Sequence, residues 1–148
     1  VVAELAAYYR SRGLTLADGI EEIYKEYGYY AEKTISVTLS GVDGAEQIKA
    51  IMAKFRNNAP KEWNATAITV VEDFKAQTAT AADGTVTNLT TPPSDVLKYT
   101  LADGSWIAVR PSGTEPKIKF YIAVVGESNE DSQAKIANIE AEINAFVK

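Results

Sequence analysis

Two strand-like segments joined by a short loop narrow the choice of folds more than any other part of this chain. In residues 105–110, Arg110 falls on the face opposite the apolar Ile107 and Val109, and in residues 118–125 every second residue from Ile118 to Val124 is apolar, which is the period of two expected for a strand with one buried face. The loop, residues 110–117, reads Arg-Pro-Ser-Gly-Thr-Glu-Pro-Lys, and its two prolines fix the backbone φ on either side of a turn. The pattern therefore predicts two neighbouring strands with a rigid connection.

The loop also contains the groups that hold a phosphate. Arg110 can grip two phosphate oxygens, and Lys117 adds a point charge. Ser112 and Thr114 offer hydroxyl groups, and Gly113 lets the backbone turn and approach an anion closely. Successive backbone N–H groups in a tight turn form an anion-binding nest. From these residues alone, a plain hairpin connection with charged edges is the alternative, because short motifs match by chance.

The run Trp-Ile-Ala-Val-Arg-Pro-Ser-Gly-Thr-Glu-Pro-Lys-Ile-Lys-Phe-Tyr at residues 106–121 resembles the phosphate-binding loop of the α-D-phosphohexomutases. The resemblance is to the C-terminal domain of bacterial phosphoglucomutases and phosphomannomutases, and it extends from residues 27–30 through the closing helix. It implies that the loop grips the substrate phosphate that is not transferred, and that Glu115 orients a neighbouring cation. The implied phosphate-binding residues are Arg110, Ser112, Gly113, Thr114 and Lys117. For Lys119 we favour an ordinary surface charge.

The resemblance further implies an activity for the full-length protein. Family members interconvert hexose 1-phosphates and 6-phosphates through a hexose 1,6-bisphosphate, assisted by Mg²⁺. The family's nucleophile, metal and sugar loops are not found in these residues. We therefore expect no catalytic and no metal-binding residue in this chain, and no activity from it alone. Its expected partners are a hexose phosphate, with glucose preferred to mannose, and domains 1–3 of the same polypeptide.

Composition excludes several other classes of function. The chain has 15 basic and 20 acidic residues, a net charge of −5, which argues against a nucleic-acid-binding surface. Residues 105–126 carry three basic and one acidic residue, a local +2, which suits a small anion. Without histidine or cysteine, the chain has no His-dependent triad, thiol nucleophile, cysteine zinc site or disulfide. No stretch approaches the length of a membrane span, and we expect a cytoplasmic protein.

Two alternatives of another kind remain open. The first is a nucleic-acid-binding module, whose available aromatic side chains are Tyr99, Trp106, Phe120 and Tyr121. The second is a ligand-sensing domain without catalysis, for which the resemblance of the loop would be a coincidence. Net charge and the lack of a basic stripe count against the first.

The N-terminal part reads as two helices, at residues 1–12 and 15–27. Gly13 ends the first, a Thr15–Asp18 capping box begins the second, and Gly28 ends the second. Because the chain begins at Val1 inside a helix, we expect a fragment of a longer protein. The resemblance implies that residues 1–29 close the preceding domain 3, with a linker at 29–33, and that residues 30–148 form domain 4. The four tyrosines at residues 24–30 favour interface packing over a sugar-stacking platform.

The remaining pattern predicts an α+β fold. Strands are predicted at residues 34–40, 66–74 and 95–101, and a turn at 41–44. One helix has its apolar stripe at residues 48–55, and another at 136–146. Residues 75–94 are weakly patterned, so we expect a mobile surface connection or loose hairpin and not a lid. The order β-α-β-β-β-β-α predicts an antiparallel sheet of about four to five strands with two helices on one face. The resemblance implies a TATA-box-binding-protein-like arrangement.

Overall fold

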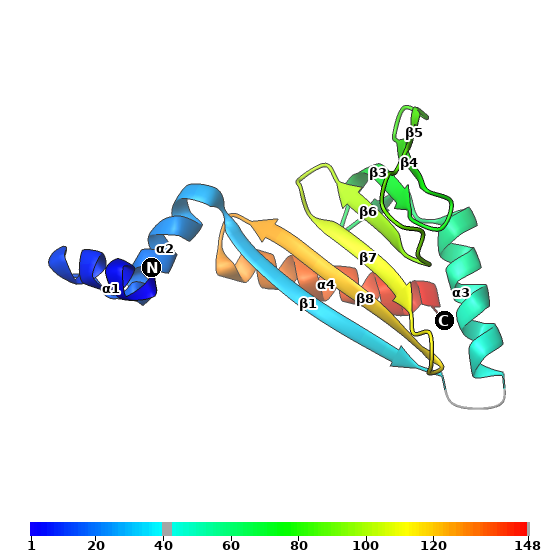
Figure 1. The fold of residues 1–148 in the computed structure, drawn as a ribbon, viewed down its shortest axis with the longest axis horizontal. Helices are drawn as coiled ribbons and strands as arrows, with labels where there is room; N and C mark the ends of the chain where they lie inside the picture. Colours follow the sequence, from blue (N-terminus) through cyan, green and yellow to red (C-terminus); the bar gives the residue numbers. More distant parts are fainter. Residues whose placement is uncertain (40–42, 148) are drawn as a thin grey trace.

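A computed structural model describes residues 1–39 and 43–147 of the chain. Figure 1 shows a long, twisted antiparallel sheet with two helices packed on one face, and a separate pair of N-terminal helices beyond one end of the sheet. The elements are α1 (Val2–Ser11), α2 (Leu16–Tyr27), β1 (Tyr29–Thr38), α3 (Gly44–Asn58), β2 (Glu62–Trp63), β3 (Thr66–Asp73), β4 (Thr78–Ala81), β5 (Val86–Asn88), β6 (Leu97–Leu101), β7 (Trp106–Pro111), β8 (Lys117–Gly126) and α4 (Asn129–Val147).

The sheet confirms the predicted fold class but has more strands than expected. Its eight strands follow the order β1-β8-β7-β6-β3-β4-β5, with β2 paired to β3, and every pairing is antiparallel. We expected four to five strands. Residues 75–94, for which we predicted a surface connection or a loose hairpin, supply two of the extra strands, because they fold as the β4–β5 hairpin. The two-residue β2 is the third addition.

The first strand also differs from its prediction. Residues 29–33 are not a linker, because β1 begins at Tyr29 and pairs with β8 over ten residues, from Tyr29 opposite Gly126 to Thr38 opposite Lys117. Pairing with β8 gives the backbone N–H and C=O groups of this stretch their hydrogen-bond partners. Residues 29–33 can therefore form a strand without alternating apolar and polar side chains. The predicted strand end and turn at residues 40–42 lie outside the described residues.

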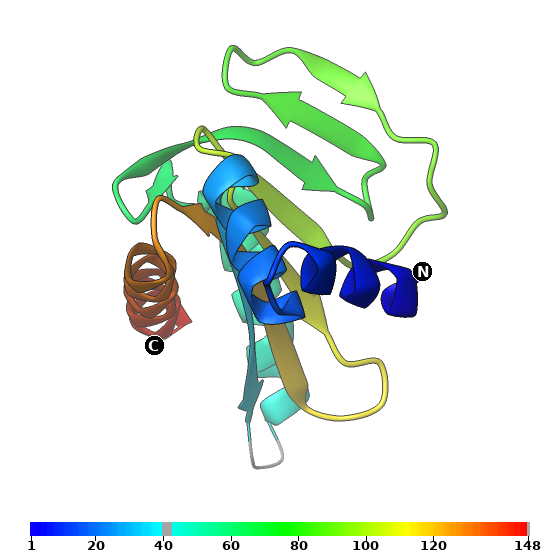
Figure 2. The ribbon, with the colours of Figure 1, turned by 90° about the vertical axis from the view of Figure 1, so that its left-hand side faces the viewer.

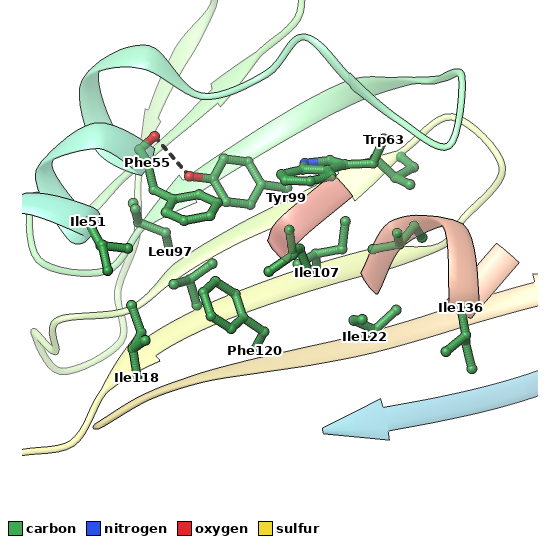
Figure 3. Packing of buried hydrophobic residues seen from close by; sticks show 14 of the residues in the cluster. Ile51, Phe55, Trp63, Leu97, Tyr99, Ile107, Ile118, Phe120, Ile122 and Ile136 are labelled. Atoms are coloured by element: carbon green, nitrogen blue, oxygen red, sulfur yellow. Dashed lines mark hydrogen bonds between the residues drawn. The ribbon is translucent and has the colours of Figure 1, made fainter. Parts of the chain in front are cut away.

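The core lies between the sheet and the two helices α3 and α4. The predicted α3 stripe (Ile48, Ile51, Met52 and Phe55) is buried, and so are Ile136, Ile139 and Ile143 of α4. Phe55 is the centre of an aromatic cluster and lies 4.6–6.4 Å, ring centre to ring centre, from Trp63, Tyr99, Phe120 and Phe146. Figure 3 shows Phe55 and Trp63 close to the inward residues Tyr99 of β6, Ile107 of β7 and Phe120 of β8. This packing holds β7 and β8, and hence the loop between them, in place.

The two N-terminal helices are attached at one end of β1 (Figure 2). The predicted capping box is present, since Thr15 and Asp18 exchange hydrogen bonds between side chain and backbone. Gly28 has a φ of 102°, which only glycine adopts readily, and ends α2 as predicted. Apart from Gly19, no residue of α1 or α2 is buried. These helices therefore share little of the core of the sheet.

Candidate functional site

The loop predicted to bind phosphate connects β7 to β8. The two strands pair with Arg110 opposite Lys119 and Pro111 opposite Ile118. Beyond the last pair, the backbone N–H of Ser112 donates to the carbonyl of Lys117 at 2.7 Å and closes the loop. Ile107 and Val109 of β7, and the alternate residues of β8, are buried. Because side chains alternate along a strand, Arg110 and Lys119 lie on the opposite face, which carries no helix.

The charges of the loop are not equivalent. Lys117 Nζ lies 3.0 Å from Glu115 Oε2, and this ion pair holds the pKa of the Glu115 carboxyl below its usual range. Glu115 is thus placed on Lys117 and not on Arg110. Within residues 1–39 and 43–147, neither Arg110 nor Lys119 has a salt bridge or a side-chain hydrogen bond. Two cations therefore face each other across the strand pair with no salt-bridge partner in the described chain, and the acidic side chain that Lys119 attracts at longer range, Glu115, is already paired with Lys117.

The other predicted residues stand in the open part of the loop. Gly113, Thr114 and Pro116 are exposed, and Ser112 is half-buried. The hydroxyl of Ser112 accepts a long hydrogen bond of 3.4 Å from the N–H of Glu115. Gly113 does not have the positive φ that would demand glycine, and a Cβ there would meet no atom within 4 Å. The benefit of glycine here is an uncovered backbone, and not a special turn geometry.

The loop forms one wall of a groove of about 940 Å³. The second wall is the first half of α3, and residues 94–96, which lead into β6, complete it. The loop is fastened to the end of β1, because the N–H of Leu39 donates to the carbonyl of Pro116 at 2.9 Å. Gly44 begins α3 at this point, and any Cβ would collide with the Leu39 carbonyl. Glycine is therefore required at Gly44 so that α3 can approach the loop.

Two contributors to this arrangement are not found by reasoning from the sequence. Lys119 is predicted to be an ordinary surface charge, yet it stands directly opposite Arg110. This position could have been inferred from the sequence. If Ser112 and Lys117 close the loop, counting back two residues along each strand places Arg110 opposite Lys119. Gly44 is predicted only as part of a turn, and its role depends on the distant residues Leu39 and Pro116, which no local pattern indicates.

Two further observations bear on other kinds of site. Within the described part of the chain, no group of three or more acidic, histidine or cysteine side chains is arranged to hold a metal ion. Nor does that part contain a helix with the length and apolar character needed to cross a membrane.

Comparisons with known proteins identify a family and several relatives that match most of this chain. The family described as phosphoglucomutase/phosphomannomutase, C-terminal domain, matches residues 37–145. A phosphoglucomutase of Staphylococcus aureus (strain bovine RF122 / ET3-1) is 36% identical over 137 residues, which cover 92% of this chain and 25% of that protein. A phosphoglucomutase of Staphylococcus haemolyticus is 32% identical over 139 residues, covering 93% and 25%. The chain thus spans about a quarter of the length of these relatives.

A solved structure resembles the fold. The open form of the Paramecium phosphoprotein pp63/parafusin, a phosphoglucomutase, matches with a TM-score of 0.53 and 18% sequence identity. The match covers 90% of this chain and 22% of that one. At this identity the likeness concerns the fold alone.

Proposed function

The chain belongs to the phosphoglucomutase and phosphomannomutase family, as its C-terminal domain, and on that premise we propose that residues 110–117 bind the non-transferred phosphate of a hexose phosphate. The full-length protein would interconvert hexose 1-phosphates and 6-phosphates. Arg110, Ser112, Gly113, Thr114 and Lys117 would form the grip. Because the named relatives are phosphoglucomutases, glucose is the preferred sugar over mannose.

One observation carries the proposal, namely the unpartnered pair of cations at the start of the loop. Like charges directly opposite each other across two strands are destabilising. Arg110 and Lys119 occupy such a position with no salt-bridge partner in the described chain. A phosphate between them would relieve the repulsion and accept charge-assisted hydrogen bonds. We therefore add Lys119 to the proposed grip.

The proposed reaction explains why a separate grip is needed. If the sugar is phosphorylated at both ends and then reorients, its unreactive end has to be held in both orientations. Positioning and electrostatics supply most of the catalysis in phosphoryl transfer. The grip would perform the positioning without contacting the phosphorus that reacts. Under this proposal no residue of this chain is catalytic, and the chain alone is inactive.

The magnesium ion and the hexose 1,6-bisphosphate belong to the whole enzyme in this proposal. The residues of this chain do not fit a magnesium site, because the described acidic side chains form no suitable cluster. We also propose that residues 1–29 close the preceding domain, since exposed apolar side chains of α1 and α2 would be covered by it; they include Val2, Leu5, Ile20 and Ile23.

The test is a backbone-amide NMR titration of the chain with glucose 6-phosphate, with glucose as the control. We expect the amides of residues 110–117 to shift with the phosphate ester and not with glucose. Arg110→Ala should abolish these shifts without a large change in thermal stability, because the side chain is exposed and unpaired. Arg10→Ala, at an exposed arginine of α1, is the matched control. Equal shifts with glucose, or a large loss of stability in Arg110→Ala, would contradict the assignment.

A further inference from the structure

Asp95 lies on the part of the groove that faces the end of the loop. Residues 94–96 line the groove together with residues 110–116. They precede β6, whose Leu97 pairs with Val109 of β7. Because the pairing is antiparallel, the chain before Leu97 runs alongside the residues that follow Val109. Asp95 is therefore brought next to the start of the loop by strand pairing.

Arg56 of α3 holds this carboxylate in a fixed position. Its Nη2 donates to Asp95 Oδ1 at 2.8 Å, while its Nε donates to Asp73 Oδ2 at 2.7 Å. The arginine side chain is only 25% exposed, so the packing around it restricts its movement. One guanidinium thus joins the C-terminal end of α3 to the end of β3 and to the groove. Asp95 is held in place before any ligand binds.

The two carboxylates that share Arg56 differ in what remains free. Asp73 uses both oxygens, because its Oδ1 accepts hydrogen bonds from the N–H groups of Lys75 and Ala76. Asp95 Oδ2 has no hydrogen-bond partner within the described chain. The Asp95 side chain is also more exposed, at 39% against 13% for Asp73. Asp73 and Asp95 share the single positive charge of Arg56, so one negative charge is left in excess. The oxygen without a partner belongs to Asp95, which lines the groove.

The groove therefore brings together two kinds of chemistry. Arg110 and the hydroxyl groups of Ser112 and Thr114 line it from the loop and suit a phosphate, and Lys49 of α3 is a second cation in its lining. The segment containing Asp95 offers a fixed anionic acceptor, which repels a phosphate and accepts hydrogen bonds from hydroxyl groups. The buried side chains of Ile48 and Met52 also line the groove and give it an apolar floor. The C–H face of a sugar ring fits such a floor.

We propose that Asp95 is a specificity-determining residue of this groove, and that it accepts hydrogen bonds from the hydroxyl groups of a ligand whose phosphate is held by the loop. This inference rests on the proposed function of the loop. The ligand class that fits is a phosphorylated sugar or polyol with hydroxyl groups next to its single bound phosphate. A ligand with a second phosphate at that position is disfavoured by the charge of Asp95.

The test compares three ligands on the 148-residue chain by amide NMR. Inorganic phosphate and butyl phosphate, which lacks further hydroxyl groups, should shift the amides of residues 110–117 only. Glucose 6-phosphate should also shift those of residues 94–96. Asp95→Asn, which keeps an oxygen for Arg56, should weaken the binding of glucose 6-phosphate about tenfold, as expected for one hydrogen bond to a charged group, and should not weaken the binding of inorganic phosphate. Glu72→Gln, at a salt-bridged acid on β3 outside the groove, is the control.

The outcomes separate the two proposals. If the loop responds to all three ligands but glucose 6-phosphate leaves residues 94–96 unmoved, Asp95 has no such role and the phosphate grip stands. The same conclusion follows if Asp95→Asn weakens the binding of inorganic phosphate and of glucose 6-phosphate equally. If no phosphate-containing ligand shifts the loop, both proposals are overturned. The ligand comparison on the unaltered chain decides the question even where Asp95→Asn is poorly folded.

Discussion

Arg110 of β7 and Lys119 of β8 stand directly opposite each other in the antiparallel pair, and neither has a salt-bridge partner in the described chain. Repulsion between the two cations lowers the stability of the fold and favours the binding of an anion between them. On the same sheet face, Lys98 of β6 is by contrast neutralised by Glu72 of β3 at 3.0 Å. The sheet thus keeps one cation paired and leaves two unpaired where the loop begins.

Replacing Lys119 with glutamine should therefore separate stability from binding. We expect Lys119→Gln to raise the free energy of unfolding by about 0.2–1 kcal/mol, the size of a cross-strand charge pair. It should also weaken phosphate binding. Phosphate should raise the melting temperature of the unaltered chain more than that of the variant. Chemical denaturation and calorimetry with and without phosphate measure both effects.

Lys98→Gln is the matched control for that variant. It removes a cation from the same face but breaks an ion pair, so it should not stabilise the chain. A loss of stability in Lys119→Gln, with unchanged phosphate binding, would show that the side chain packs against the sheet and does not serve an anion.

The buried hydroxyl of Tyr99 connects β6 to α3. It donates a 3.0 Å hydrogen bond to the carbonyl of Phe55, in the last turn of the helix, where carbonyl groups lack helical partners (Figure 3). Tyr99→Phe should lower the free energy of unfolding by about 1–2 kcal/mol, because a buried acceptor is left without a donor. Urea denaturation measures this change in the free energy of unfolding. Tyr121→Phe, at a half-buried tyrosine on the open face, should have a smaller effect.

Tyr99 should also make stability depend on alkaline pH. Burial raises the pKa of Tyr99 well above its usual value of about 10. The unfolded chain loses this proton first, so the contribution of Tyr99 is complete below about pH 10 and declines as the pH rises further. We expect the unfolding free energy to fall more steeply above pH 10 in the unaltered chain than in Tyr99→Phe. Parallel slopes for the two proteins would contradict this assignment.

The β2–β3 hairpin contains a strained alanine. Trp63 pairs with Thr66, and the two residues between them, Asn64 and Ala65, have φ values of 49° and 54°. Asparagine tolerates this left-handed region, whereas alanine is disfavoured there by roughly 1 kcal/mol. Ala65→Gly should raise the melting temperature by a few degrees in calorimetry. Ala67→Gly, inside β3 without a positive φ, should lower it.

The N-terminal helices should be dispensable for the fold of the sheet. Because no residue of α1 or α2 other than Gly19 is buried, a chain beginning at Gly28 should keep the core of Phe55, Tyr99 and Phe120. We expect its melting temperature to change by no more than a few degrees. Preserved amide chemical shifts in β6, β7 and β8 would verify that the core is unchanged. Loss of cooperative unfolding would show that α2 supports β1 more than its contacts indicate.

Local pattern by itself determined several elements of this protein. The stripe from Ile48 to Phe55 predicted α3 with its buried face, since a period of 3.6 residues is legible without knowledge of the partner. Thr15 and Asp18 predicted the start of α2, because a capping box lies within one turn. The alternation in residues 105–110 and 118–125 predicted both strands and the loop between them. Each of these depends on residues close together in the chain.

The other features were decided by the tertiary structure alone, because they depend on which distant segments of the chain come into contact. The strands β4 and β5 have half-buried or exposed side chains throughout, so no alternation marks them, and only the pairing of β4 with β3 and of β5 with β4 defines them. Gly44 is required because α3 begins against Leu39 and Pro116. Asp95 becomes part of the candidate groove through strand pairing with β7 and through Arg56, a residue 39 positions earlier. The loop proposed to bind phosphate could be recognised in the sequence, but the carboxylate that lines its groove is brought there only in the folded chain.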